Sequence, residues 1–349
     1  MPPMKSRTAI LLAVALSASA LSSPIASADV GPGSSDHTET DTHTDADFDS
    51  GDGTVSALAG GVRFDTSKNG SGSESGQPAP TGNWAPPACW YAPKWTPTQF
   101  KIYVENIWAG DSTGYQWDAE QRKRYEGGEP YTDFNMKKSG KGYWWDSFVA
   151  EGRAADPGAD DCGKPYFWVD KGSAPPADAK NAVSPKILAQ LAYSELRVPD
   201  TKVTLSPSLE AKQTVNLPTW AWLDKTAFKP VSVTASVDAL NISATTTATP
   251  VSLRLDPGTE DAELHPASGE CPIEDGRIGT PYTKGQGDRT PPCGLTYLRA
   301  SQDGPFPFKA TLTWKISWEG SDGRGGDLPD GTFGTTTEVT VQEAQAVNR

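Results

Sequence analysis

The amino-acid sequence predicts a mainly β protein, in which a C-terminal antiparallel β-sandwich follows a small aromatic-rich α+β region. Two observations predict this fold class. Apolar and polar residues alternate in several short stretches of 201–349, with Gly, Pro and Asp between them, and this alternation is typical of strands that bury one face. Eight of the 12 tryptophans lie between Trp84 and Trp168, which indicates that 83–200 is a separate region.

Residues 1–28 have the features of a secretory signal peptide. Lys5 and Arg7 give a positive start, and 9–21 is an apolar stretch too short to span a bilayer. The sequence Ala-Ser-Ala at 26–28 is a small-x-small cleavage site. No later stretch has about 18 consecutive apolar residues. We therefore expect a secreted protein, free or associated with the cell envelope, that does not span a membrane after cleavage.

Residues 29–82 are low in complexity and contain almost no large apolar side chains. They carry ten acidic and two basic residues. A segment of this composition buries too little apolar surface to offset the entropy lost when it becomes ordered. The sequence therefore predicts a disordered acidic Gly/Ser linker over 29–82.

The charge of the chain and its motifs exclude several classes of function. The formal net charge is −13, from 31 basic and 44 acidic residues. Binding of nucleic acid depends on clustered Lys and Arg, and the one basic cluster, 122–124, lies among acidic residues, so we expect no nucleic-acid partner. The sequence has no H-E-x-x-H, phosphate-loop or dinucleotide-binding motif. We therefore expect no metal and no cofactor.

The four cysteines are Cys89, Cys162, Cys271 and Cys293. An even number of cysteines in an exported chain favours disulfides, and four cysteines allow three pairings. The sequence-local pairing joins Cys89 to Cys162 and Cys271 to Cys293, with one bridge in each half. A zinc site is the alternative, but no pair of cysteines has C-x-x-C spacing and the three histidines lie elsewhere.

Two helices and two short strands are predicted in 83–200. Thr96-Pro97 has the form of an N-cap followed by proline, apolar residues then recur at helical spacing, and Gly110 ends the helix. Ser184-Pro185 begins a second helix, which ends before Pro199. The polar stretch that contains Tyr115, Trp117, Tyr125 and Tyr131 is expected to be irregular. Residues 142–149 and 165–170 are expected to be short strands or extended segments.

Strands are predicted throughout 201–349. The clearest alternations are at 231–239, 242–248, 312–318 and 339–341. Trp220 and Trp222 lie two residues apart, so they point to one face of their strand, and we expect both in the core. A region with about seven or eight short strands is typical of a β-sandwich.

Several segments of this half carry a resemblance to a known family. They are Leu217-Pro218-Thr219-Trp220-Ala221-Trp222, Leu255-Asp256-Pro257-Gly258, Pro292-Cys293-Gly294-Leu295-Thr296-Tyr297 and Thr313-Trp314-Lys315-Ile316-Ser317-Trp318. These segments resemble exported actinobacterial proteins of unestablished function, with a C-terminal half similar to the PKD-type Ig-like sandwich. The D-G turn of PKD modules is Asp256-Pro257-Gly258 here, whereas their later H-x-Y is replaced within 293–297. The resemblance covers roughly 184–342 and implies fold and export, but no catalytic residues.

The string Gly110-Asp111-Ser112-Thr113-Gly114 matches the G-x-S-x-G pattern of serine hydrolases. Ser112 would be the nucleophile, with His265 as the base and Asp261 as the acid that orients it. A nucleophile elbow sits between a strand and a helix. Here the preceding residues fit a helix and no helical pattern follows, so the sequence favours a glycine-rich helix stop.

The aromatic density of 83–170 has two interpretations. Exposed flat rings could stack on sugar faces, and the candidate binding residues are Trp90, Trp95, Trp144 and Trp145. Trp144 and Trp145 are adjacent, so on a strand they face opposite ways and one of them is free to face solvent. The other interpretation, which the sequence favours, is that a small region uses large rings to build its core.

These observations together predict a monomeric, non-catalytic module, secreted or associated with the cell envelope. Its expected ligand is an extracellular protein or a cell-wall glycan. The alternative function is that of a secreted serine esterase that uses Ser112.

Overall fold

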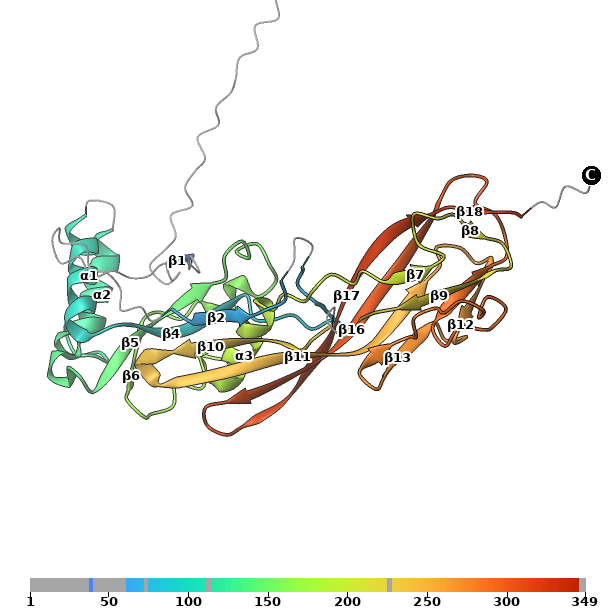
Figure 1. Cartoon of the computed structure of the whole chain (residues 1–349). Helices are drawn as coiled ribbons and strands as arrows, with labels where there is room; N and C mark the ends of the chain where they lie inside the picture. Colours follow the sequence, from blue (N-terminus) through green and yellow to red (C-terminus); the bar gives the residue numbers. More distant parts are fainter. Residues whose placement is uncertain (1–37, 40–60, 72–74, 111–113, 225–227, 345–349) are drawn as a thin grey trace, which may run out of the picture.

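The computed structural model of this chain describes residues 38–39, 61–71, 75–110, 114–224 and 228–344. The architecture is mainly β and elongated, with antiparallel sheets in both halves (Figure 1). The expected signal peptide lies outside the described residues.

Three antiparallel strands of 15 residues each run along the molecule (Figure 1). They are β11 (Ile242–Asp256), β16 (Phe306–Gly320) and β17 (Gly325–Val339). Strand β16 lies in the middle and pairs with β11 on one side and β17 on the other. The predicted strands at 242–248 and 312–318 are confirmed, and both extend well beyond the stretch that alternates most clearly.

The second edge of β11 changes its partner halfway along. The first half of β11 pairs with β10 (Val231–Val237), and the second half pairs with β13 (Glu270–Glu274), which in turn carries β14 (Arg277–Ile278). Between the two halves the register of β11 with β16 shifts after Pro250, a residue with no N–H to give to a ladder. The register of β16 with β17 shifts next to Trp314, which is the partner of Pro250.

The prediction of a disordered linker over 29–82 is wrong for 61–71 and 75–82, which the structure describes. Strand β2 (Arg63–Lys68) pairs with β10, and β3 (Ala79–Pro80) pairs with β17. Strand β1 (Thr38–Glu39) pairs in parallel with β5. The physical reason is that the edge of β10 offers unpaired backbone groups, which accept a polar strand as readily as an apolar one.

A four-stranded sheet lies beside the second half of β11 and the first half of β16. Its order is β12 (Ala262–His265), β15 (Gly294–Tyr297), β9 (Pro218–Trp222) and β7 (Thr204–Ser206). The Cys271–Cys293 disulfide and the stacking of Tyr297 on Phe306, with 5.6 Å between ring centroids, join this sheet to the large one. Two short strands, β8 (Gln213–Thr214) and β18 (Val341–Gln342), pair in parallel. In β9, Trp220 is buried as expected, whereas Trp222 is only half-buried.

The aromatic-rich region is built on a second small sheet. Strand β5 (Gly142–Val149) lies between β4 (Cys89–Trp95) and β6 (Phe167–Asp170). Helix α1 (Pro97–Ala109) has the predicted start, because Thr96 and Gln99 form a reciprocal capping box before the proline turn. The short 3-10 helices of the described chain include η1 (Asp133–Lys138), η2 (Ala159–Cys162) and η3 (Asp238–Leu240).

The expectation of an irregular stretch after Gly110 is wrong at one place. Residues Tyr115–Tyr125 form helix α2, with Asp118 in the first turn and three basic residues in the last. This distribution of charge suits the helix dipole. The helix buries little besides Gln121 and Tyr125, so the apolar spacing that would have indicated a helix is missing from the sequence.

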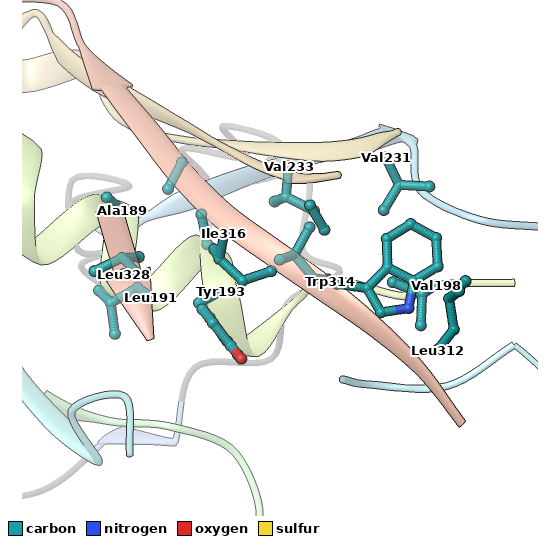
Figure 2. Packing of buried hydrophobic residues seen from close by; sticks show 14 of the residues in the cluster. Ala189, Leu191, Tyr193, Val198, Val231, Val233, Leu312, Trp314, Ile316 and Leu328 are labelled. Atoms are coloured by element: carbon teal, nitrogen blue, oxygen red, sulfur yellow. The ribbon is translucent and has the colours of Figure 1, made fainter. Parts of the chain in front are cut away.

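Helix α3 (Pro185–Ser194) connects the two halves. It begins at the predicted Ser184 cap and lies against β10, β11 and β16. Figure 2 shows Leu191 and Tyr193 of this helix in the same packing layer as Val233, Trp314 and Ile316 of the sheet. Just before α3, the backbone N–H of Tyr91 in β4 donates to the carbonyl oxygen of Asn181, and the N–H of Val183 donates to the carbonyl oxygen of Tyr91. One continuous hydrophobic core therefore runs from β4 to β15.

The contact between α3 and β11 gives a testable prediction about stability. Thr246 is fully buried, and its hydroxyl donates to the carbonyl oxygen of Ala189 at 2.8 Å. Replacement Thr246→Val removes the donor, so we expect the free energy of unfolding to fall by about 1 kcal/mol. The control Thr247→Val, at the neighbouring half-buried position, should change it by about 0.5 kcal/mol or less. Urea unfolding followed by circular dichroism measures both; equal losses would contradict the docking of α3 through Thr246.

Candidate functional site

The four tryptophans predicted as candidate binding residues all lie in the core. Trp90, Trp95, Trp144 and Trp145 expose 3%, 2%, 0% and 2% of their surface. Trp144 and Trp145 do belong to different sides of β5, but both sides are covered. Trp144 joins the rings near α1, and Trp145 joins the core shared with α3. The interpretation with an exposed ring is therefore wrong for these four residues. The favoured interpretation, in which the rings build the core, holds for them.

The rings near α1 form a separate group, here called the aromatic cluster. Its buried members are Trp95, Phe100, Val104, Trp108, Tyr125, Phe134, Trp144 and Trp168, and Tyr103, Trp117, Tyr131 and Tyr166 pack against them. Phe100 stacks on Trp144 with 4.2 Å between ring centroids and meets Tyr125 edge-on at 5.0 Å. Pairs of this kind contribute about 0.5–1.5 kcal/mol each beyond the area they bury. The capped first turn of α1 fixes where Phe100 enters the cluster.

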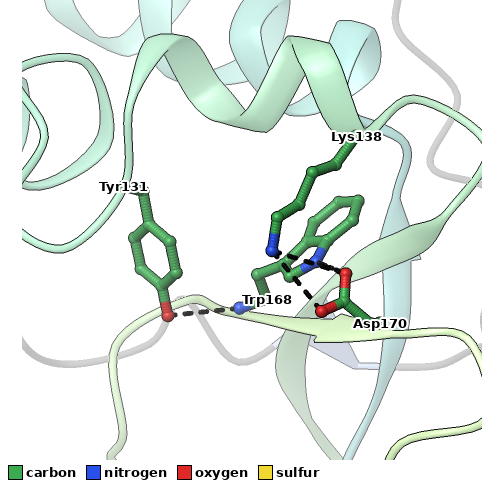
Figure 3. A network of polar contacts seen from close by, with 4 residues as sticks. All are labelled: Tyr131, Lys138, Trp168 and Asp170. Atoms are coloured by element: carbon green, nitrogen blue, oxygen red, sulfur yellow. Dashed lines mark hydrogen bonds and ion pairs between the residues drawn. The ribbon is translucent and has the colours of Figure 1, made fainter.

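A polar network closes the aromatic cluster beside β6 (Figure 3). The indole nitrogen of Trp168 donates to Asp170 Oδ1 at 2.7 Å, and Lys138 Nζ lies 3.4 Å from Asp170 Oδ2. The backbone nitrogen of Trp168 donates to the hydroxyl of Tyr131 at 3.3 Å. Chiefly because of the indole donor, and also because of Lys138, the pKa of Asp170 lies below its usual value. The network ties η1 to β6.

Two tyrosines of the aromatic cluster are held in their neutral form. Burial raises the pKa of the Tyr166 phenol, and the negative charge of Asp146 adds to the shift. Burial also raises the pKa of the Tyr125 phenol, although Arg124 opposes the shift. Both hydroxyls have partners: Tyr103 Oη lies 3.3 Å from Tyr166 Oη, and Tyr125 donates to the Tyr166 carbonyl oxygen. These phenols are therefore packing groups and are not suited to act as bases.

Strands β4 and β5 also carry an ion pair that no sequence pattern predicts. Lys94 Nζ and Asp146 Oδ2 are 2.8 Å apart, and their side chains expose 7% and 0% of their surface. The ammonium lies 4.6 Å from the ring centroid of Trp95 and 5.3 Å from that of Phe148. Because burial of two charges costs several kcal/mol per ion, such a pair between two strands is an unusual feature of a small sheet.

His265 and Asp261, which the esterase alternative would use with Ser112, each bond a different partner. Ser112 itself lies outside the described residues, but its near neighbours Gly110 and Gly114 are at the end of α1 and the start of α2. Figure 1 places these helices at the opposite end of the molecule from β12, which carries His265. The His265 ring bonds Thr296 Oγ1 at 3.1 Å, and Asp261 pairs with Arg299 at 2.8 Å.

One surface of the long sheet carries a regular array of hydroxyl groups, here called the hydroxyl face. It consists of Ser232, Thr234, Ser236, Ser243, Thr245, Thr247 and Ser317. All seven are half-buried, and the residues between them along β10 and β11, which are Val233, Ala235, Ala244 and Thr246, are buried. Neighbours face each other across strands, as Thr234 and Thr245 do with hydroxyls 2.8 Å apart. Lys68, Asp65 and Arg63 of β2 continue these rows with charged groups.

Two open hollows lie on the C-terminal half. One, of about 390 Å³, is lined by 201–203, Leu209 and residues of β16 and β17, including three threonines at 335–337. The other, of about 460 Å³, lies beside the Cys271–Cys293 disulfide and has Glu274, Asp275 and Arg277 on its wall. Among the described residues, no group of three or more His, Cys, Asp or Glu side chains is arranged to hold a metal ion.

The cysteines form the sequence-local disulfides. Cys89 is bonded to Cys162, and Cys271 is bonded to Cys293. The first bridge connects β4 to η2 in the aromatic-rich region, and the second connects β13 to the segment before β15. Their sulfur atoms are therefore not available as zinc ligands.

Comparison with protein-family models, with curated proteins and with solved structures finds no match to this chain. Within the part of the chain that the structure describes, no helix is both long enough and apolar enough to cross a bilayer.

The buried phenols give a prediction about alkaline pH. A phenol whose pKa is raised in the folded state ionises first in the unfolded chain, at about pH 10, so the unfolded state gains stability there and the free energy of unfolding falls as pH rises. Removing one such group by Tyr166→Phe should make the fall above about pH 10 less steep by about 1.4 kcal/mol per pH unit. Urea unfolding over this pH range measures the slope. A slope unchanged by Tyr166→Phe would mean that this phenol ionises in the folded protein.

Proposed function

We propose that this chain is a monomeric, non-catalytic module, secreted or associated with the cell envelope, that binds a cell-wall glycan. The proposal includes a PKD/Ig-like assignment for the C-terminal half, which the two facing antiparallel sheets and the resemblance of 184–342 support. The observation that carries the function is the hydroxyl face. It is an extended polar surface of the described chain, to which strands β10, β11 and β16 each contribute.

The hydroxyl face suits a polyhydroxylated ligand. Each Ser or Thr hydroxyl both donates and accepts hydrogen bonds, as a sugar hydroxyl does. Neighbouring strands lie about 4.8 Å apart, and outward residues repeat about every 6.8 Å along a strand. The array is therefore periodic in two directions, as an extended polysaccharide is periodic in one. The charged rim on β2, which includes Arg63 and Asp65, adds groups that bond sugar hydroxyls strongly.

A protein ligand is the less favoured alternative. Stable protein interfaces are built around buried aromatic and other large apolar anchors. The large apolar residues that the described chain exposes are scattered over separate elements and do not form a patch; they are Ile102, Tyr115, Leu217, Val251 and Leu298. None of them lies on the hydroxyl face.

The remaining observations support secretion and a lack of nucleic-acid partners. Both disulfides are closed, as is usual of proteins in an oxidising compartment. The net charge of −13 opposes binding to phosphate backbones. The expected signal peptide at 1–28 is consistent with secretion.

Retention on purified cell wall tests the glycan proposal. We expect the wild-type chain to co-sediment with the insoluble wall polysaccharide, and the triple variant Thr234→Val, Thr245→Val, Thr247→Val to lose most of this retention. Valine preserves the shape and strand preference of threonine while removing the hydroxyl. The matched control, Thr204→Val with Thr336→Val, changes exposed threonines outside the hydroxyl face and should be retained like the wild type.

Two outcomes would contradict this proposal. Retention of the triple variant equal to that of the wild type would remove the hydroxyl face as the binding surface.

The esterase alternative is tested with a p-nitrophenyl ester. Robust turnover that is abolished by Ser112→Ala would replace the binding function with a catalytic one, whereas we expect no turnover that depends on Ser112.

A further inference from the structure

The ion pair between Lys94 and Asp146 is set apart by its burial. Among the ion pairs between described residues, it is the one in which both partners expose less than a tenth of their side chains. No surface of the proposed binding function uses it. The question is therefore what a buried amine and a buried carboxyl, held in contact, can do.

The local backbone brings the two groups together. Lys94 lies at an irregularity of β4, because the pairing with β5 shifts between Pro93 and Trp95. An extra residue of this kind re-aims a side chain, and Asp146 lies on β5 opposite Ala92, two residues before Lys94. The Lys94 amine therefore reaches diagonally across the strand pair to the carboxyl group, where Nζ lies 2.8 Å from Oδ2.

The carboxyl group is fixed from its other side as well. Its second oxygen, Oδ1, accepts the backbone N–H of Ser147 at 2.8 Å. The rings of Trp95 and Phe148 lie beside the amine, and Asp146 itself has no exposed surface. The two reacting groups are thus held in contact in largely apolar surroundings.

We propose that Lys94 and Asp146 condense into an intramolecular amide bond that cross-links β4 to β5. A proton passed from Nζ to Oδ2 along their hydrogen bond gives the uncharged amine and the carboxylic acid. The lone pair of Nζ then attacks Cγ of Asp146. The new C–N bond replaces the C–OH bond, and the hydroxyl leaves with one hydrogen from the amine as a single water molecule. Neither an oxidant nor a cofactor is needed.

Burial is what makes this pair reactive. Water solvates an ammonium and a carboxylate and so keeps both groups ionised. Apolar surroundings remove that solvation and favour the neutral forms of such groups. Fixed contact also replaces a bimolecular encounter, an advantage that reaches effective concentrations of about 10⁵ M or more. Lys123 and Glu129 provide the comparison, because their atoms are 2.7 Å apart but their side chains are 64% and 68% exposed. We expect no bond there.

The cross-link would complete the fastening of β4. Cys89, at the start of this strand, is tied to η2 by a disulfide, and Lys94 lies one residue from the end of the strand. A covalent link at each end holds the strand even if the sheet opens locally. Such a strand resists proteolysis and heat, which suits a protein that functions outside the cell.

Mass spectrometry of the full chain tests the proposal directly. After reduction and alkylation of the disulfides, we expect the intact wild-type protein to be lighter than its sequence by the mass of one water molecule. Trypsin should then release peptide 69–101, uncleaved at Lys94, joined to peptide 142–153, which contains Asp146. Cleavage after Lys123 should be normal and give no joined peptide with Glu129.

Variants and a clear negative result complete the test. Lys94→Arg and Asp146→Ala should each have the full mass of their sequence and a lower melting temperature than the wild type. A wild-type protein with its full sequence mass, which releases peptides 69–94 and 95–101 separately, would show that the pair is only an ion pair and overturn the proposal. This measurement on the wild type decides the matter even if the variants fail to fold.

Discussion

The uninterrupted strands β11, β16 and β17 hold the two ends of the molecule together. Each strand has 15 residues, more than twice the length of about five or six that is usual for strands. Helix α3 covers one face of the first half of β11 and of the second half of β16, which lie side by side. At the other end, the sheet that contains β9 and β15 packs against the same hydrophobic core. The part of the molecule packed around α3 cannot separate from the part that contains β9 and β15 without breaking ladder hydrogen bonds in all three strands. The irregularities near Pro250 and Trp314 increase the twist of the large sheet. This twist lets the same sheet pack against α3 at one end and against the small sheet at the other.

The position of α3 on one side of the large sheet leaves the other side of the sheet as a surface for binding. The sheet is buried on the side of α3, so its hydroxyl face is the opposite side of the same ladders and is rigid for the same reason. A binding surface that is ordered before its ligand arrives loses less entropy on binding. The aromatic-rich region at the other end contributes no exposed ring from its central strands. Its role in our account is to be a stable, covalently fastened end of the molecule, through the Cys89–Cys162 disulfide and the proposed bond between Lys94 and Asp146.

Much of the fold could be predicted from local sequence, and the failures have physical causes. Strand β10 follows the predicted alternation and α1 has the predicted start, because period-two patterns and caps are encoded locally. Helix α2 was missed because its N-cap is Gly114, which has no capping side chain, and its residues are almost all polar. Strand β2 was missed because its order comes from the edge of β10 rather than from its own side chains. Lys94 and Asp146 were missed because only the register of β4 with β5 joins them, across 52 residues of sequence.

The three long strands make the two ends of the molecule one cooperative unit. Hydrogen exchange, followed by mass spectrometry at increasing concentrations of denaturant, can check this cooperativity, because exchange reports the stability of each segment separately. We expect peptides from β5 and from β15, which lie at opposite ends, to lose their protection at the same midpoint, as in a two-state transition. Separate midpoints, with one half still protected where the other has opened, would contradict it.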